Sequence, residues 1–431
     1  MTSDREAVVF VWLSGQGYVP AALLSESSGG ASYTLGYGRR YAARPDALPL
    51  DPVSLPLYMP RPATSRRGVL FPVLRDAAPD KWGRKVLGLM AGRHAGTLSE
   101  MDFLVSAHSP DRIGALAFGD TPAGGPRSLA PWAQDDAMTV PEGDSACSDG
   151  SAWLERIARV VAEVDALADD EDLDDLRKTL PEEAFLQALA SSLSVGGGRP
   201  KALVRMPEGH CIAKFGKRGD PWDEPRIEHA TMTLAARCGI HVSPTRLMET
   251  DHGSVLLVRR FDRTPDGTPR HFISGFTLNA AIDEDGDWGS YHDLAQRARQ
   301  HGDSHAGPEL FRRMVFNALC ANIDDHPRNH AWFVEREGLS MTPAYDIVPT
   351  QARFKTYDLA LRCGTEGRRA SLANVLTRPE PFGLRRDEAE AIARDIAGVM
   401  STWRDHFAAC GVVTKDLDEL AYRFRGVPEG V

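Results

Sequence analysis

The chain has 431 residues, of which 42% are hydrophobic and 26% charged, and its formal net charge is −10. This composition is typical of a globular protein long enough for two or three domains. The negative charge argues against a protein that coats nucleic acid through a basic face. No apolar run reaches the roughly 18 residues that a membrane-spanning helix needs, so we expect no membrane attachment.

Cysteine usage and the first residues predict a cytoplasmic location. The run Met1–Glu6 is polar and does not resemble a signal peptide. The six cysteines form no Cys-x-x-Cys pair and lie at Cys147, Cys211, Cys238, Cys320, Cys363 and Cys410. Scattered cysteines are typical of reduced thiols and provide no zinc signature.

Residues 1–120 are predicted to form a β-rich subdomain. Val8–Leu13 and Ser32–Tyr37 have the composition of strands, and Arg112–Phe118 is expected to be the strand that closes the unit. Between them, the segment Asp80–Ala91 has apolar residues at helical spacing, which predicts a helix.

The rest of the chain is predicted to contain a linker and two further regions. Residues 121–150 are rich in Pro, Gly, Ala and Ser, which favours a linker. Residues 151–262 are expected to form a second region, which begins with a helix at Ser151. Residues 263–431 are expected to form a mostly helical lobe. The other predicted helices are 226–237, 308–321, 387–399 and 402–407.

Two features in the middle of the chain favour phosphate binding. Three consecutive glycines, Gly196–Gly198, precede a short predicted strand. Glycines allow backbone N–H groups to approach phosphate oxygens, because no side chain intervenes. The next strand, Cys211–Phe215, contains Lys214 among apolar neighbours. A lysine in that position usually needs an anionic partner.

A polar loop near residue 324 has the spacing of a kinase catalytic loop. Asp324 and Asn329 are separated by four residues, and Asp346 follows seventeen residues after Asn329. In protein kinases the Asp of this spacing accepts the proton of the substrate hydroxyl, while the Asn binds Mg²⁺. A second Asp would add another oxygen ligand for this hard cation.

These features occur in the order that phosphoryl transfer from ATP requires. The glycines would cover the phosphates, and Lys214 would neutralise their charge. Glu228, on the predicted helix that follows, would orient Lys214 through an ion pair. Asp324 would deprotonate the acceptor hydroxyl. The complete ordered set favours a kinase more strongly than any single member does.

Each member also has a purely structural explanation. The glycines alone would form a flexible hairpin, Lys214 could extend its ammonium group to solvent, and Glu228 favours a helix N-terminus. Asp324, Asn329 and Asp346 are common turn formers.

A transition-metal site is a further alternative for the same loop. His326 and His330 lie four residues apart beside two aspartates. However, Pro327 lies between them and prevents the helical geometry that would place both rings on one face. We therefore favour Asp324 as the functional carboxylate of the loop and expect Asp325 to shape the loop.

Six segments also resemble the HipA family of bacterial serine/threonine kinases, the toxins of type II toxin–antitoxin modules. The similarity extends over nearly the whole chain. The segments that carry it are Leu70–Arg84, Asp111–Phe118, Gly196–Leu203, Leu257–Arg263, Ile323–Asn329 and Thr342–Ile347. The resemblance implies an α+β, two-lobed, protein-kinase-like fold. In that fold an N-terminal β-rich subdomain accompanies a kinase N-lobe, expected at residues 151–262, and a mostly helical C-terminal lobe.

The resemblance also implies site residues and the cofactors ATP and Mg²⁺. Asp324 matches the catalytic base, and Asn329 and Asp346 match the metal ligands. Arg259 stands where an acidic hinge residue is often found, so contact with the adenine would use backbone carbonyls. The positions expected at the nucleotide are Ser194, Val195, Gly196, Gly197, Gly198, Lys201, Lys214, Glu228, Arg259, Phe261, His326 and Tyr345.

The same resemblance implies regulation and partners. Ser194 matches the serine that family members autophosphorylate, and Ser192 is a neighbouring candidate. The protein substrate would be a translation component such as an aminoacyl-tRNA synthetase. A HipB-like antitoxin would bind the chain and provide any contact with DNA.

We therefore predict an ATP- and Mg²⁺-dependent serine/threonine protein kinase of the HipA toxin type. Two alternatives remain open at this point. One is a co-repressor or binding protein that has the HipA fold but little catalytic activity. The other is a small-molecule hydroxyl kinase, against which the long N-terminal subdomain and the serine beside the glycines argue.

Overall fold

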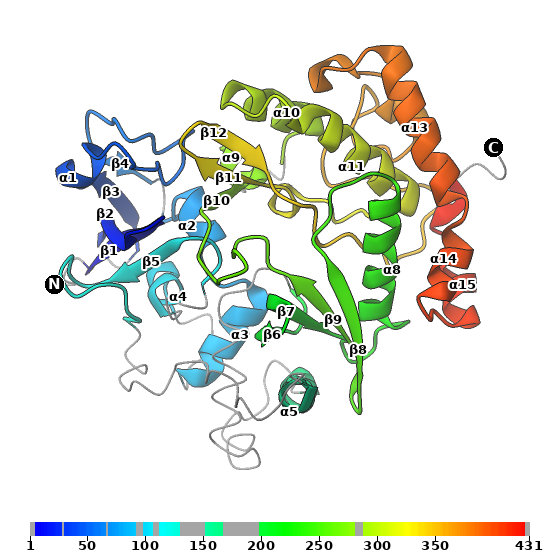
Figure 1. The fold of residues 1–431 in the computed structure, drawn as a ribbon, viewed down its shortest axis with the longest axis horizontal. Coiled ribbons are helices and arrows are strands. Elements are labelled where there is room, and N and C mark those ends of the chain that lie inside the picture. Colours follow the sequence, from blue (N-terminus) through cyan, green and yellow to red (C-terminus); the bar gives the residue numbers. More distant parts are fainter. Residues whose placement is uncertain are drawn as a thin grey trace. The chain divides into compact units, whose positions relative to one another are not determined.

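The computed structural model describes residues 5–27, 30–65, 68–91, 98–106, 112–129, 151–166, 198–280 and 288–426. The fold is α+β, with antiparallel sheets and helices (Figure 1). The chain divides into two compact units. The first combines Met1–Arg218 with Glu249–Phe272, and the second combines Gly219–Met248 with Ile273–Val431. Among the described residues, no helix is long and apolar enough to cross a membrane.

The first unit contains a five-stranded antiparallel sheet. Its strand order is β4 (Ala63–Thr64), β3 (Ser32–Tyr37), β2 (Gly17–Ser27), β1 (Arg5–Leu13) and β5 (Leu116–Gly119). Residues Ala7–Val11 of β1 are all buried, as expected for a strand covered on both faces. The described helices between β3 and β5 in the chain are α1 (Arg39–Ala42), α2 (Pro72–Asp76), α3 (Lys81–Met90) and α4 (Glu100–Ser106). The predicted strands Val8–Leu13 and Ser32–Tyr37 and the helix near residues 80–91 are confirmed.

The closing strand of this sheet is shorter than predicted. The prediction was Arg112–Phe118, whereas β5 begins at Leu116. The preceding residues turn, and the backbone N–H of Gly114 donates to the carboxylate of Asp262 at 2.7 Å. The carbonyl oxygen of Arg112 accepts from Arg260 at 2.8 Å. A side-chain cluster distant in sequence therefore takes the backbone groups that a strand would have used.

A second sheet in the first unit contains the segments expected at the nucleotide. Its order is β6 (Lys201–Met206), β7 (Gly209–Phe215), β9 (Gly253–Arg259) and β8 (Thr245–Thr250), and the division between the units falls within β8. Strands β6 and β7 pair antiparallel with Lys201 opposite Lys214. Helix α5 (Ser151–Ala166) begins where Ser151 was expected to start a helix. Strand β8 was not predicted.

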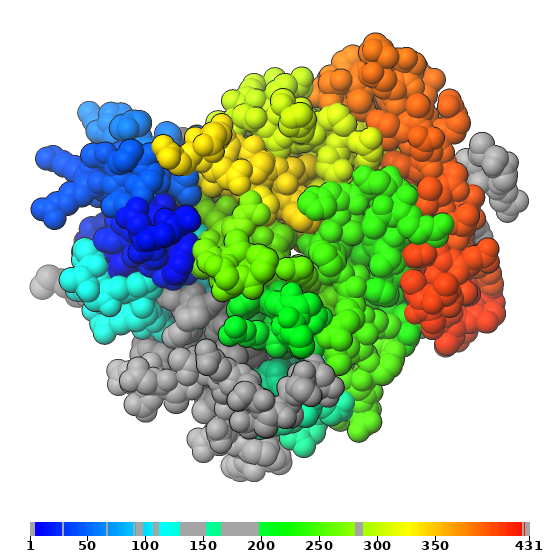
Figure 2. Space-filling view, in the orientation of Figure 1, coloured from blue at the N-terminus to red at the C-terminus, as the bar shows by residue number. Residues whose placement is uncertain are grey.

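The second unit is mostly helical. It contains α8 (Glu224–Arg237), α9 (Gly275–Leu278), α10 (Tyr291–Gln300), α11 (Ala306–Cys320), α12 (Leu372–Val375), α13 (Arg386–Met400), α14 (Trp403–Ala409) and α15 (Thr414–Leu420). Short 3₁₀ helices lie at Pro327–Asn329, Glu380–Phe382 and Phe424–Gly426. A small sheet has the order β10 (Phe272–Ser274), β11 (Ala331–Glu335) and β12 (Gly338–Met341). Figure 2 shows α13 to α15 in orange and red beside the green surface of α8.

Helix α11 is the central helix of the second unit and leads into the polar loop. Its predicted apolar stripe is buried: Leu310, Phe311, Met314, Val315, Ala318 and Leu319. It packs against α10 and α13. The helix ends at Cys320 and is capped by Ala321, whose φ of +53° is left-handed. This conformation redirects the chain into the loop that begins at Asn322, at some cost in strain for a residue other than glycine.

Helix α8 begins two residues before its predicted start. Asp223 caps it by accepting a hydrogen bond from the backbone N–H of Arg226 at 3.2 Å, and Pro225 occupies the first turn. Glu228 consequently lies in the second turn, where it is 3% exposed. The predicted start at residue 226 would instead place Glu228 in the first turn.

Candidate active site

In the loop between α11 and β11, the Asp-x4-Asn spacing allows Asn329 to form a hydrogen bond with the backbone of Asp324. The backbone N–H of Asn329 donates to the carbonyl oxygen of His326 at 2.9 Å, which closes the 3₁₀ turn. The side-chain amide of Asn329 then donates from Nδ2 to the carbonyl oxygen of Asp324 at 2.8 Å. Asn329 therefore fixes the backbone at Asp324 through its nitrogen, and its Oδ1 atom is the one suited to a cation.

Asp346 has a backbone conformation that is uncommon for a residue other than glycine. Its φ is +59°, in the left-handed region. Asp tolerates this region better than most residues, and such strain occurs often at functional sites. Asp346 lines the same pocket as Asn329. The oxygen donors of Asn329 and Asp346 fit Mg²⁺, which prefers carboxylate and amide oxygens.

Asp324 is exposed in this loop, whereas the neighbouring carboxylate is not. Partial desolvation raises the pKa of Asp324; the charge of His326 opposes this change, and the carboxylate of Asp346 adds to it. The electrostatic influence of Asp346 is consistent with two carboxylates that belong to one site. A raised pKa makes the Asp324 carboxylate a stronger proton acceptor than an ordinary aspartate.

Asp325 points into the helical lobe and is 1% exposed. Its carboxylate accepts hydrogen bonds from the backbone N–H of Ala360 at 2.7 Å and from the hydroxyl of Tyr291. Burial raises the pKa of Asp325 to about 7, although these hydrogen bonds lower it. These contacts agree with the expectation that Asp325 shapes the loop.

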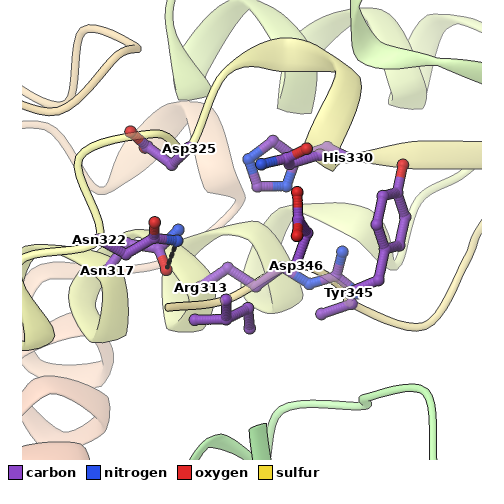
Figure 3. Close-up of a pocket in the computed structure, with 10 residues that line it drawn as sticks. Arg313, Asn317, Asn322, Asp325, His330, Tyr345 and Asp346 are labelled. Carbon is purple, nitrogen blue, oxygen red and sulfur yellow. Dashed lines mark hydrogen bonds between the residues drawn. The ribbon is translucent and has the colours of Figure 1, made fainter. Parts of the chain in front are cut away.

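Figure 3 shows the pocket beside the loop, with its polar residues drawn from α11, the loop and the segment after β12. The lining residues are Arg313, Asn317, Asn322, Asp325, Asn329, His330, Ala344, Tyr345, Asp346 and Ile347. Tyr345 supports the loop by donating from its hydroxyl to the carbonyl oxygen of Arg328 at 2.6 Å. A polar pocket thus lies against the predicted metal ligands.

His330 and Arg313 are buried members of this pocket. Neither ring nitrogen of His330 has a hydrogen-bond partner among the described residues. Burial lowers the pKa of His330 well below its usual value, with the charge of Arg313 acting in the same direction, so the ring is neutral. Arg313 donates to Glu309 at 2.9 Å and to the carbonyl oxygen of Thr342 at 2.8 Å.

The alternative of a transition-metal site at His326 and His330, which the sequence disfavoured, gains no support from the described residues. In the described part of the chain, no group of three or more His, Cys, Asp or Glu side chains could hold a metal ion. The ring of His326 instead packs edge-on against Trp288, with centroids 5.9 Å apart.

The first unit contains the residues predicted to meet the phosphates. Because Lys201 and Lys214 are directly opposite in the β6–β7 ladder, they share a face of the sheet. Lys201 is 2% exposed and forms an ion pair with Asp80 at 3.2 Å, whereas Lys214 is half-buried. Gly198 is exposed, and a Cβ added there would meet no atom within 4 Å.

The remaining predicted nucleotide residues are placed as follows. Arg259 ends β9, and Phe261 packs edge-on against Phe272, with centroids 5.1 Å apart. Lys214 and Glu228 belong to different units, so their ion pair stays a prediction. Five predicted residues lie outside the described residues: Ser192, Ser194, Val195, Gly196 and Gly197.

Residues 193–403 match the family described as the HipA-like C-terminal domain. The chain carries a HipA-like C-terminal domain. Its fold resembles HipA in a Shewanella oneidensis complex of HipA, HipB and operator DNA, with a TM-score of 0.61 and 16% identity. This match covers 98% of the chain and 95% of that protein, so the HipA-like fold includes the N-terminal β-rich subdomain.

Two curated proteins are also similar to parts of the chain. "Putative kinase Y4dM" of Sinorhizobium fredii is 29% identical over 149 residues, which are 32% of this chain and 36% of that protein. A "Putative kinase" of Haemophilus influenzae is 26% identical over 182 residues, which are 36% of this chain and 52% of that protein. The aligned parts thus span about a third and about half of these relatives.

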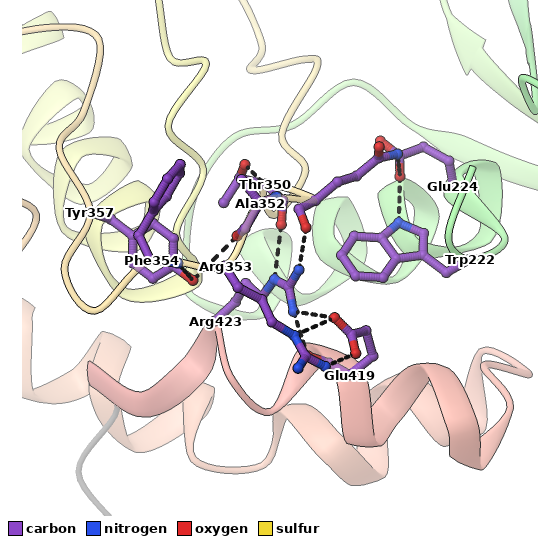
Figure 4. Close-up of polar contacts among 10 residues, drawn as sticks. Trp222, Glu224, Thr350, Ala352, Arg353, Phe354, Tyr357, Glu419 and Arg423 are labelled. Atoms are coloured by element: carbon purple, nitrogen blue, oxygen red, sulfur yellow. Dashed lines mark hydrogen bonds and ion pairs between the residues drawn. The ribbon is translucent and has the colours of Figure 1, made fainter. Parts of the chain in front are cut away.

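The HipA-like domain also contains an anchored segment that no sequence pattern predicted (Figure 4). This segment, residues 350–353, follows Asp346. Arg423, which is 3% exposed, donates to the carbonyl oxygen of Thr350 at 3.0 Å and to that of Gln351. The side chain of Gln351 donates to Glu224 at 3.0 Å. The segment after Asp346 is therefore bound to Arg423 near the C-terminus and to Glu224 at the start of α8.

Proposed function

We propose that this chain is an ATP- and Mg²⁺-dependent protein kinase that phosphorylates a serine or threonine hydroxyl. The observation that carries the proposal is the convergence of Asp324, Asn329 and Asp346. Asn329 holds the backbone at Asp324, while Asp346 lines the same pocket as Asn329 and influences the pKa of Asp324. The HipA-like domain and the two relatives named as kinases support the same chemistry.

The residues divide the reaction between them. The acceptor hydroxyl gives its proton to Asp324 while its oxygen forms a bond to the γ-phosphorus. The bond from that phosphorus to the bridging β–γ oxygen breaks, and ADP leaves. Asn329 and Asp346 would hold Mg²⁺, which when bound neutralises charge on the phosphates. Lys214 would add positive charge next to the glycine segment, whereas the charge of Lys201 is balanced by Asp80.

The finer proposals concern substrate, control and partner. We propose autophosphorylation at Ser194 or Ser192 and a translation component, such as an aminoacyl-tRNA synthetase, as the protein substrate. The similar Shewanella oneidensis protein was solved with HipB and operator DNA, which supports a HipB-like antitoxin as the partner of this chain. A net charge of −10 is compatible with DNA contact through such a partner in the cytoplasm.

The test is phosphate transfer measured by intact mass spectrometry with and without Mg²⁺-ATP, followed by peptide mapping. We expect added phosphate on the wild-type chain, and a rate about 10³-fold lower for Asp324→Asn because the proton acceptor is lost. Asp120→Asn provides the control, since Asp120 is exposed and pairs with Arg127 in the first unit. Equal rates for Asp324→Asn and the wild type would contradict the mechanism. Nucleotide binding without any transfer would favour a binding protein instead.

A further inference from the structure

We propose that Tyr291 and Asn317 are positioning residues for Asp324, acting through the two loop residues on either side of it, Asn322 and Asp325. This inference rests on the proposed kinase function and deepens it. Neither Tyr291 nor Asn317 belongs to a motif that the sequence patterns identified.

The four residues form a continuous hydrogen-bond chain. Asn322 donates from Nδ2 to Oδ1 of Asn317 at 3.1 Å, and Asn317 donates from Nδ2 to the hydroxyl of Tyr291 at 2.9 Å. That hydroxyl donates to Oδ2 of Asp325. Figure 3 shows the contact between Asn317 and Asn322.

Burial makes this chain a strong structural constraint. The exposed fractions are 0% for Tyr291, 1% for Asp325, 2% for Asn322 and 3% for Asn317. A buried polar group without a partner costs about 1–3 kcal/mol, so a network whose donors and acceptors are matched strongly favours one arrangement. The network therefore specifies where the loop lies relative to α10 and α11.

The constraint acts on both sides of Asp324. Two residues before Asp324, the side chain of Asn322 is bound to Asn317. Immediately after Asp324, the carboxylate of Asp325 is bound to the hydroxyl of Tyr291 and the backbone N–H of Ala360. In addition, the side-chain amide of Asn329 donates a hydrogen bond to the carbonyl oxygen of Asp324 itself. The backbone of Asp324 is consequently fixed while its side chain stays exposed.

A fixed base is the requirement of the proposed chemistry. Proton acceptance needs Asp324 within hydrogen-bond reach of the acceptor hydroxyl, and a displacement of about 1 Å can cost about 10²-fold in rate. Loss of the network should lower kcat, since the base moves relative to the hydroxyl. KM for ATP should change little, because neither Tyr291 nor Asn317 is among the residues proposed to hold the nucleotide.

Tyr291→Phe tests the inference because it removes one oxygen atom and keeps the ring. We expect kcat for serine phosphorylation to fall about tenfold, with KM for ATP within about twofold of the wild type. Amide hydrogen exchange in the peptide that contains Asp324 should increase about tenfold. Tyr41→Phe is the matched control. Tyr41 is a 2% exposed tyrosine of the first unit whose hydroxyl donates to the carbonyl oxygen of Leu48 at 2.8 Å.

The outcomes separate this inference from the proposed function. Wild-type kcat and wild-type exchange in Tyr291→Phe would overturn the positioning role. A wild-type chain that transfers no phosphate would overturn the kinase proposal, and the exchange measurement alone would then decide the inference. If Tyr291→Phe does not fold, Asn322→Ala serves instead, with an expected loss in kcat of about threefold. Unchanged kcat and exchange in that variant would also overturn the inference.

Discussion

Two buried polar clusters, one in each unit, are built in different ways: the Asp262 cluster of the first unit, and the hydrogen-bond chain that ends at Asp325 in the second. In the first unit, Asp262 lies between Arg260 and Arg263, with Nη2 of Arg260 at 2.7 Å and Nη1 of Arg263 at 3.0 Å. The same carboxylate accepts from the backbone N–H of Gly114, 148 residues away. In the second unit, the hydrogen-bond chain from Asn322 to Asp325 contains no positively charged side chain.

The two clusters suit different structural roles. Ion pairs attract over several ångströms, so a charge cluster can join segments that are distant in sequence. Hydrogen bonds weaken steeply when they are misaligned, so a hydrogen-bond chain can set the position of a loop. We therefore expect changes in the Asp262 cluster to affect mainly stability and changes around Asp325 to affect mainly rate.

The strongest test of this comparison is Asp262→Asn. The change leaves two buried guanidinium groups without their carboxylate, and we expect a loss of about 3–5 kcal/mol in the free energy of unfolding. Urea unfolding would measure it. Asp266→Asn, in the exposed turn of the same unit, is the control and should cost less than about 1 kcal/mol. A small effect for Asp262→Asn would mean that the cluster does not join the two segments.

The second test uses the buried pair of Lys201 and Asp80. Lys201→Met should cost about 3 kcal/mol, because Asp80 would be left as a lone buried carboxylate. Asp80→Asn keeps the oxygen that accepts from the backbone N–H of Gly83 at 2.7 Å, so the cap of α3 survives. The double variant should recover most of the loss, since no lone charge remains. Urea unfolding of all four chains would measure the coupling, and strictly additive losses would contradict it.

The third and smallest effect is a pH dependence from His271. This side chain is 5% exposed, and burial lowers its pKa to about 4, so it is neutral in the folded chain. The unfolded chain, with a pKa of about 6.5, binds more protons between these values. His271 therefore does not lower the free energy of unfolding above pH 6.5. As the pH falls towards 4 the free energy of unfolding decreases, by about 2 kcal/mol at pH 5.

His271→Gln should remove this contribution. The glutamine amide can still donate to the carbonyl oxygen of Leu50, which lies 2.9 Å from Nε2 of His271. Urea unfolding at pH 7.5 and pH 5 would measure the difference between the two chains. The same pH dependence in both chains would exclude His271 as its source.

Elements with strong local signals were predictable from the sequence. Helix α11 is two residues longer at its start than its apolar stripe predicted, and it ends one residue earlier. The loop after it has the expected spacing because a 3₁₀ turn returns Asn329 to the carbonyl oxygen of Asp324. The start of strand β5 could not be predicted from local signals. The contacts of Arg112 and Gly114 with the Asp262 cluster, which place the start of the strand at Leu116, form only in the folded chain.

The order of the candidate catalytic residues and the elements that carry them follow from the sequence, since spacing and periodicity are local properties. The distant groups that support these residues depend on how the elements pack in the folded chain. Asp80 meets Lys201 across 121 residues, and Tyr291 meets Asp325 across 34. Such partners depend on directional contacts between packed elements, and no local pattern of residues records which side chains will meet.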